Sequence, residues 1–161
     1  MSLINHRRRS DRWHGASQKV GQSAAPLFLD RIDIQCEITP VPFKDISKAA
    51  QGEPSAEIRK RVIRAREIQA ERFSGQKGIH CNAQMSERMI HQYAEPDEAG
   101  ISMLRMAMER LSLSARAYNR ILKVARTIAD LEGCEHVESH HLAEAIGYRT
   151  LDRGDWAERG I

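Results

Sequence analysis

Between Ser55 and about residue 150, apolar residues recur every three or four positions along the sequence. This spacing places apolar side chains on one face of a helix, and that face must be buried against a neighbouring element. The periodicity predicts five amphipathic helices, at about residues 55–73, 85–94, 98–111, 115–132 and 140–149. Aromatic residues make up only 5% of the chain, so aliphatic side chains have to supply most of the core. The pattern predicts an all-α fold, a helical bundle of four to five helices.

Signals for helix ends accompany these segments. A side-chain oxygen just before a helix can accept from the first free backbone N–H groups, and Ser55, Ser86, Asp97 and Ser114 occupy such positions. Gly133 follows the fourth segment, where a residue in the left-handed conformation commonly ends a helix. We therefore expect four capped starts and one glycine-terminated end.

Upstream of the helices, the sequence changes to a period of two. Ile32, Ile34, Cys36 and Ile38 alternate with polar residues, which predicts a strand that ends at the following prolines. One strand cannot form a sheet, so this orphan strand needs a partner outside the helical region. We expect it to lie in an extended N-terminal arm.

Composition divides the chain further. Residues 1–25 are polar, basic and without periodicity, which predicts a disordered basic leader, and residues 154–161 are predicted to be a disordered tail. The helical domain spans 54–153, and residues 26–53 connect it to the leader. No apolar run of about 20 residues is present, and no apolar segment follows the basic start, so we expect no membrane association and no secretory signal.

The three cysteines, Cys36, Cys81 and Cys134, are far apart in the sequence and odd in number. This usage favours reduced thiols and a cytoplasmic location. The net charge of +3 is too small to identify a nucleic-acid-binding protein by itself.

One cysteine and three histidines near the C-terminal end of the helical region are candidates for metal ligands. Cys134, His136, His140 and His141 lie close in sequence, but zinc sites use paired ligands at short spacing, and this region lacks such pairs. His140 and His141 are adjacent at a predicted helix start, where they should face different directions. We predict no metal site. The sequence also contains no Gly-x-x-x-x-Gly-Lys-Ser/Thr loop for nucleotide phosphates.

Two groups of arginines are candidates for contact with phosphates. The run from Arg59 to Arg66 is interleaved with glutamates, which favours a solvated helix face over a nucleic-acid-binding one. Arg116 stands in the first turn of the fourth helix, where a cation opposes the helix dipole. A phosphate bound at that terminus would be favoured by both the dipole and the guanidinium. Arg31 immediately precedes the predicted strand and should project from the edge of that strand.

Several segments resemble the C-terminal part of the magnesium-chelatase-related AAA+ ATPases of the ComM/YifB type. The resemblance covers residues 27–153, and it is carried by the segments LDRIDIQCEITPVPF, SAEIRKRVIRAREIQAERF, IHCNAQMS, ERLSLSARAYNRILKVARTIADLEG and HHLAEAIGYRTLDR. The sequence before Arg31 reads GQSAAPLFLDR, which departs from the family's usual Arg-x-Ser-Gly-Pro-Leu-Leu-Asp-Arg.

The resemblance implies that residues 54–153 are the lid domain of an AAA+ ATPase and that residues 26–53 are a remnant of its core. Arg31 then looks like the arginine finger, a catalytic residue that reaches the nucleotide of a neighbouring subunit. Arg116 looks like the sensor-2 residue, which contacts the γ-phosphate of ATP.

The resemblance also implies cofactors and partners. ATP and Mg²⁺ would be the cofactors of the full-length protein, with no cofactor expected for this segment alone. The Walker A and Walker B elements would lie upstream, so the isolated chain is expected to be inactive. The partners would be the AAA+ core of the same protein, neighbouring subunits of a ring, expected to be a hexamer, and DNA.

Two alternatives for the function remain open. One is a stand-alone nucleic-acid-binding module that uses the Arg59–Arg66 face, and the other is the lid of a porphyrin magnesium chelatase motor subunit.

Overall fold

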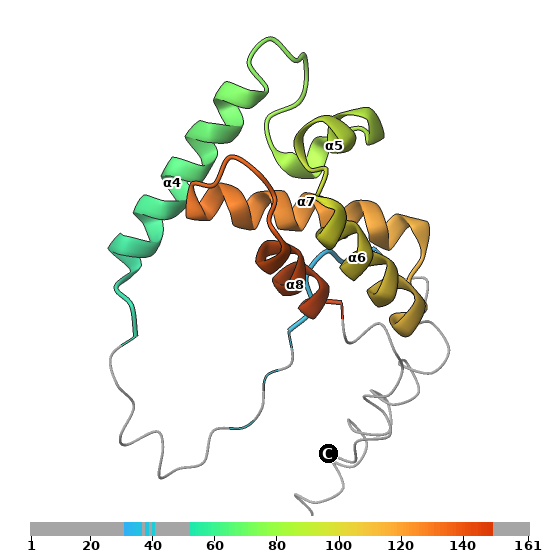
Figure 1. Ribbon diagram of the computed structural model, residues 1–161. Helices are drawn as coiled ribbons and strands as arrows, with labels where there is room; N and C mark the ends of the chain where they lie inside the picture. Colours follow the sequence, from blue (N-terminus) through green and yellow to red (C-terminus); the bar gives the residue numbers. More distant parts are fainter. Residues whose placement is uncertain (1–30, 37, 39, 41–51, 150–161) are drawn as a thin grey trace, which may run out of the picture.

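The computed structural model describes residues 31–36, 38, 40 and 52–149, and within them it confirms the all-α helical bundle (Figure 1). The elements are α4 (Ser55–Arg72), the 3-10 helix η1 (Asn82–Gln84), α5 (Glu87–Tyr93), α6 (Glu98–Leu111), α7 (Ala115–Glu132) and α8 (Ser139–Gly147). The predicted leader, the predicted tail and most of residues 26–53 lie outside the described residues. None of the described helices has the length and apolar character that crossing a membrane requires.

Helix α7 is the centre of the bundle. Helices α4, α5 and α8 and the η1 turn pack against it, and α6 packs on α8 (Figure 1). Because α7 has neighbours on several sides, its buried residues extend beyond one narrow stripe. They are Ala117, Ile121, Leu122, Ala125, Arg126, Ile128, Ala129 and Asp130. Three of these are alanines, which allow the neighbouring backbones to approach closely.

The core is made mainly of aliphatic and methionine side chains. Its large buried members include Met85, Ile90, Leu104 and Leu142, which come from four different parts of the chain. Helices α5 and α8, with 7 and 9 residues, are too short to be stable alone in water, so burial of these side chains supplies most of their stability. The aromatic side chains are few, as the composition requires.

Three of the four predicted caps are confirmed. Ser86, Asp97 and Ser114 accept hydrogen bonds from the backbone N–H groups of Met89, Gly100 and Ala117, respectively. Gly133 ends α7 with a φ of 78°, in the left-handed region that favours glycine. These boundaries therefore follow from local side-chain and backbone chemistry.

The predicted Ser55 cap is wrong. Pro54 occupies the N-cap position, with φ −61° and ψ 137°, and Ser55 is already the first residue of α4. The Pro54 carbonyl accepts hydrogen bonds from Glu57 N–H and Ile58 N–H, so the first turn begins one residue earlier than predicted.

The apolar face predicted for α4 is buried only in its C-terminal half. Ala65 and the neighbouring Gln69 are buried, whereas Ile58 and Val62 are 42% and 40% exposed. Figure 1 shows the reason, because the N-terminal half of α4 projects beyond the end of α7. A helical period alone cannot show how much of a helix has a neighbour.

Residues 31–36 form an arm that lies against the end of α8. The backbone N–H of Gln35 donates to the carbonyl of Tyr148 at 3.1 Å, and Arg149 donates through Nη1 to the carbonyl of Ile32. The structure assigns no strand within this arm. Residues 37 and 39 lie outside the described residues, so the strand over 32–38 stays a prediction.

Candidate functional site

A groove of about 650 Å³ opens beside α7, bordered by η1, α8 and the arm. Its apolar surface includes Val124, Ile128 and Leu131 of α7 and Ile34 of the arm. This volume lies within the range of about 300–1,000 Å³ that is usual for small-molecule sites. We refer to it as the α7 groove.

Three cationic residues of α7 line the groove, namely Arg116, Arg120 and Lys123. They recur at i, i+4 and i+7, so they share one side of the helix and extend over about 10 Å of its length. Arg116 is exposed in the first turn, one residue after Ala115. The groove therefore has a cationic wall that begins at a helix N-terminus.

The side chain of Lys123 is half-buried, and a hydrogen bond to η1 restrains it. Its Nζ donates to the carbonyl of Ala83 in η1 at 2.9 Å. Burial lowers the pKa of Lys123, and the nearby charge of Arg120 acts in the same direction, whereas the charge of Asp33 opposes the shift. The hydrogen bond from Lys123 to Ala83 holds η1, one border of the groove, against α7.

Acidic side chains face the cationic wall. Asp33 of the arm forms an ion pair with Arg120. Glu144 of α8 accepts a hydrogen bond from the hydroxyl of Tyr148 at 2.8 Å, which raises the pKa of Tyr148, and both residues line the groove. The α7 groove is thus basic on the α7 side and acidic on the side of α8 and the arm.

The two predicted site residues, Arg116 and Arg31, differ in their position relative to the α7 groove. Arg116 lines the groove, whereas Arg31 is exposed and lies outside the lining of the groove. Arg31 is nevertheless two residues before Asp33, so its Cα lies within about 7 Å of the Cα of Asp33. The sequence prediction missed Arg120 and Lys123, although their spacing from Arg116 was a usable signal.

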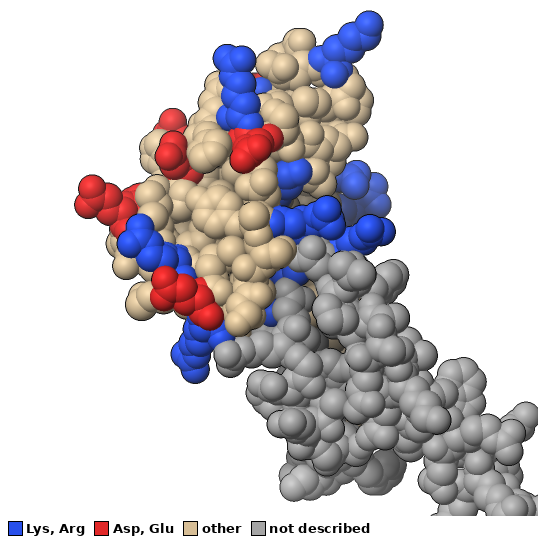
Figure 2. Space-filling view, turned by 90° about the vertical axis from the view of Figure 1, so that its right-hand side faces the viewer, with Lys and Arg blue, Asp and Glu red and all other residues tan. Residues whose placement is uncertain are grey.

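On the face shown in Figure 2, several described basic side chains lie along one edge, and others lie beside the acidic side chains on the opposite side. The predicted basic face of α4 is more balanced. Lys60 pairs with Glu57 at 2.8 Å, Arg61 pairs with Glu53, and all of these side chains are at least 41% exposed. This arrangement agrees with the solvated salt-bridged face that the interleaved charges predicted.

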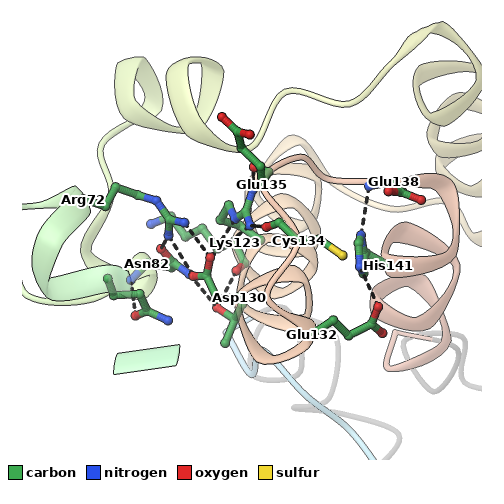
Figure 3. Close-up of polar contacts among 12 residues, drawn as sticks. Arg72, Asn82, Lys123, Asp130, Glu132, Cys134, Glu135, Glu138 and His141 are labelled. Atoms are coloured by element: carbon green, nitrogen blue, oxygen red, sulfur yellow. Dashed lines mark hydrogen bonds and ion pairs between the residues drawn. The ribbon is translucent and has the colours of Figure 1, made fainter. Parts of the chain in front are cut away.

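A buried polar network holds α7 in place (Figure 3). Asp130 is enclosed by donors from three parts of the chain, because it accepts from Arg72 of α4, Asn82 of η1 and Arg126 of α7. Arg126 also donates to the carbonyls of Cys134 and Glu135 in the loop after α7. Nothing in the sequence pattern identified this network, since its polar residues occupy positions within buried helix faces.

The network sets the charge state of Asp130. Burial alone would raise the pKa of this carboxyl, but the hydrogen bonds from Arg72 and Asn82 and the charge of Arg126 outweigh it. The pKa of Asp130 is therefore lowered. Burial conversely lowers the pKa of Arg126, against the attraction of Asp130.

The expectation that His140 and His141 face different directions is wrong. Both rings converge on Glu132, with His140 Nε2 and His141 Nε2 at 3.0 and 3.1 Å from its Oε2. The cause is tertiary, because the end of α7 that carries Glu132 lies beside the start of α8. The ring centroids of the two histidines are 3.9 Å apart.

This cluster forms part of a helix cap. Nδ1 of the buried His141 accepts the backbone N–H of Glu138 at 2.9 Å (Figure 3). A neutral imidazole carries one proton, so that proton lies on Nε2 and donates to Glu132. Nε2 then has no lone pair for a metal ion, although the three side chains lie close enough to surround one. The absence of a metal site stays a prediction, and this tautomer supports it.

Cys36, Cys81 and Cys134 all lie in the described part of the chain and form no disulfide bonds. Cys36 is exposed and the other two are half-buried. This agrees with the prediction of reduced thiols.

Comparison with known sequences identifies the family. Residues 52–149 match the family described as magnesium chelatase, subunit ChlI C-terminal. Competence protein ComM of Haemophilus influenzae is 41% identical over 127 residues, and protein YifB of Salmonella typhimurium is 42% identical over 127 residues. Each alignment covers 78% of this chain and 24% of the relative, so the chain spans about a quarter of the length of these relatives. The chain belongs to the magnesium chelatase C-terminal family, and it is a domain of the ComM/YifB type.

Proposed function

We propose that this domain is the lid of a magnesium-chelatase-like AAA+ ATPase and that Arg116 contacts the γ-phosphate of ATP. The observation that carries the proposal is the position of Arg116, exposed in the first turn of α7 and on the wall of the α7 groove. A helix N-terminus and a planar guanidinium both favour a phosphate. Closure of the lid would bring Arg116 to the nucleotide.

We further propose that Arg31 acts as an arginine finger toward a neighbouring subunit of a ring. Its exposed side chain supports this role, because a finger has to extend beyond its own domain. ATP and Mg²⁺ would be bound by the core of the full-length protein. Arginine fingers act by stabilising charge on the phosphoryl group during transfer.

For the whole protein, DNA is the proposed substrate class. The relative named as a competence protein supports this choice. A second candidate is the motor subunit of a porphyrin magnesium chelatase, which the description of the matched family favours. Stimulation of ATP hydrolysis by DNA, with no response to porphyrin, would distinguish the first candidate from the second.

A chimera tests the roles of the two arginines. Residues 27–153 would replace the matching segment of the Haemophilus relative, and ATP hydrolysis would be measured. We expect Arg116→Ala to reduce turnover by at least about tenfold and Arg31→Ala by about a hundredfold or more. Arg88→Ala on α5 is the matched control and should retain activity. Full turnover by the Arg116→Ala chimera would show that Arg116 is not a sensor.

The isolated chain is proposed to lack ATPase activity, since its sequence has no phosphate-binding loop of the Walker A type. Turnover by the isolated chain that disappears with Arg116→Ala would contradict this proposal. The alternative of a nucleic-acid-binding module predicts an affinity for DNA that falls steeply with salt concentration. An isolated lid should instead bind DNA barely at all.

A further inference from the structure

We propose that Asp33 occupies an anion site on Arg120, and that a short polyphosphate entering the α7 groove displaces Asp33 and takes its place. The ion pair between Asp33 and Arg120 lies on the groove wall that also carries Arg116. Asp33 would therefore act as a built-in competitor for the ligand. The inference rests on the proposed function only in treating Arg116 as a neighbouring contact for the same anion.

Asp33 satisfies only part of the Arg120 guanidinium. The carboxylate accepts from Nη1, whereas Nε of Arg120 is buried and has no hydrogen-bond acceptor among the described residues. A guanidinium presents parallel donors that match two oxygens of a phosphate. A buried donor without an acceptor raises the free energy of the arrangement in which Asp33 is paired with Arg120. Exchange of Asp33 for an anion with more acceptor oxygens is therefore favoured.

Asp33 can move without release of the arm. On one side of it, the carbonyl of Ile32 accepts from Arg149, and on the other side Gln35 N–H donates to Tyr148. These contacts hold the backbone of the arm on α8. The Asp33 side chain is 52% exposed, so rotation about its side-chain bonds can carry the carboxylate into water. The exchange therefore requires a change of one side chain.

The charges around the groove indicate the class of ligand. Arg116, Arg120 and Lys123 extend along about 10 Å of α7, which suits a short chain of phosphates better than a single one. Glu144 on the opposite side disfavours a broad polyanion such as a nucleic-acid duplex. The ligand class is therefore a linear polyphosphate, either free or as part of a nucleotide.

The test is an NMR titration of the whole 161-residue chain with inorganic tripolyphosphate at constant ionic strength. Asp33→Asn should bind about two- to fivefold more tightly, the range expected when one exposed ion pair is removed. Arg120→Gln should bind more weakly, and Asp33→Asn should have no further effect in that background. Arg88→Gln controls for total charge and should bind as the parent chain does. Spectra that match the parent outside the groove will show that the variants are folded.

Unchanged affinity of Asp33→Asn would overturn the inference, and so would equal losses for Arg120→Gln and Arg88→Gln. The proposed function fails separately. If Arg116→Gln has no effect while Asp33→Asn strengthens binding, the role of Arg116 is wrong and the competition by Asp33 stands. If Arg116→Gln weakens binding and Asp33→Asn has no effect, the role of Arg116 stands and the competition by Asp33 is wrong.

A parallel titration with ATP distinguishes a nucleotide from free polyphosphate, because a nucleotide site will bind ATP more tightly than tripolyphosphate, with the same dependence on Asp33.

Discussion

Arg72, the last residue of α4, forms two hydrogen bonds with the carboxylate of Asp130 on α7, at 2.7 and 2.5 Å (Figure 3). The Asp130 side chain is completely buried, and that of Arg72 is 13% exposed. The pair joins residues 58 positions apart in sequence. It therefore fixes the end of α4 on the helix that carries the groove.

Replacement of Asp130 by alanine should be strongly destabilising. The change removes the carboxylate that pairs with the buried guanidinium of Arg126 and the largely buried guanidinium of Arg72. Removal of one partner from a buried ion pair costs about 3–5 kcal/mol of unfolding free energy. Urea unfolding followed by circular dichroism will measure the free energy of unfolding. Glu57→Ala is the control, because its pair with Lys60 is exposed and should contribute about 1 kcal/mol or less. Similar losses in the two variants would show that the network is not stabilising.

The same network predicts acid sensitivity. Because the pKa of Asp130 is lowered in the folded protein, its contribution to stability is present above the unfolded pKa of about 3.9. That contribution is lost as the pH falls through the lower folded value. The difference in unfolding free energy between the parent and Asp130→Asn should therefore shrink below about pH 4. A difference that stays constant between pH 7 and pH 2 would contradict the shift.

The pair between Glu132 and His140 should be visible in a histidine titration. The hydrogen bond to Glu132, together with the nearby acidic charges, raises the pKa of His140 above its usual value. Glu132→Gln should lower that pKa toward about 6.5, as measured by NMR. Because the pKa of His140 is higher in the folded protein than in the unfolded chain, the pair stabilises the fold below the unfolded pKa of about 6.5. This stabilisation is lost as the pH rises through the higher pKa of the folded protein. Glu87→Gln on α5 should leave the His140 titration unchanged.

Two helical glycines give a matched test of packing. A Cβ at Gly100 of α6 would lie 2.6 Å from Cδ1 of Leu142 and 2.8 Å from Cβ of Pro96, so Gly100→Ala should cost about 1–3 kcal/mol. A Cβ at Gly147 of α8 would meet nothing within 4 Å. Gly147→Ala should therefore be neutral or stabilising by up to about 1 kcal/mol. Thermal unfolding of the two variants will decide, and equal melting temperatures would mean that α6 and α8 are not closely packed.

The local features of the fold could be predicted from the sequence because short-range chemistry decides them. Ser86, Asp97 and Ser114 cap helices through oxygens that reach backbone groups three residues away, and Gly133 ends a helix through its own φ. The position of Arg116 in a first helical turn follows in the same way. The cap predicted at Ser55 is wrong, because Pro54 supplies the extended residue at the N-cap position of α4.

The sequence by itself determined which segments are helices, where most of them begin and end, and the family to which the chain belongs. Only the tertiary structure decided that the N-terminal half of α4 projects beyond α7 (Figure 1) and leaves Ile58 and Val62 exposed, that two histidines share Glu132, and that Asp33 faces Arg120. The physical reason is distance along the chain. Helical periods and caps depend on residues a few positions apart, whereas Asp33 and Arg120 are 87 positions apart and meet only after the helices have packed.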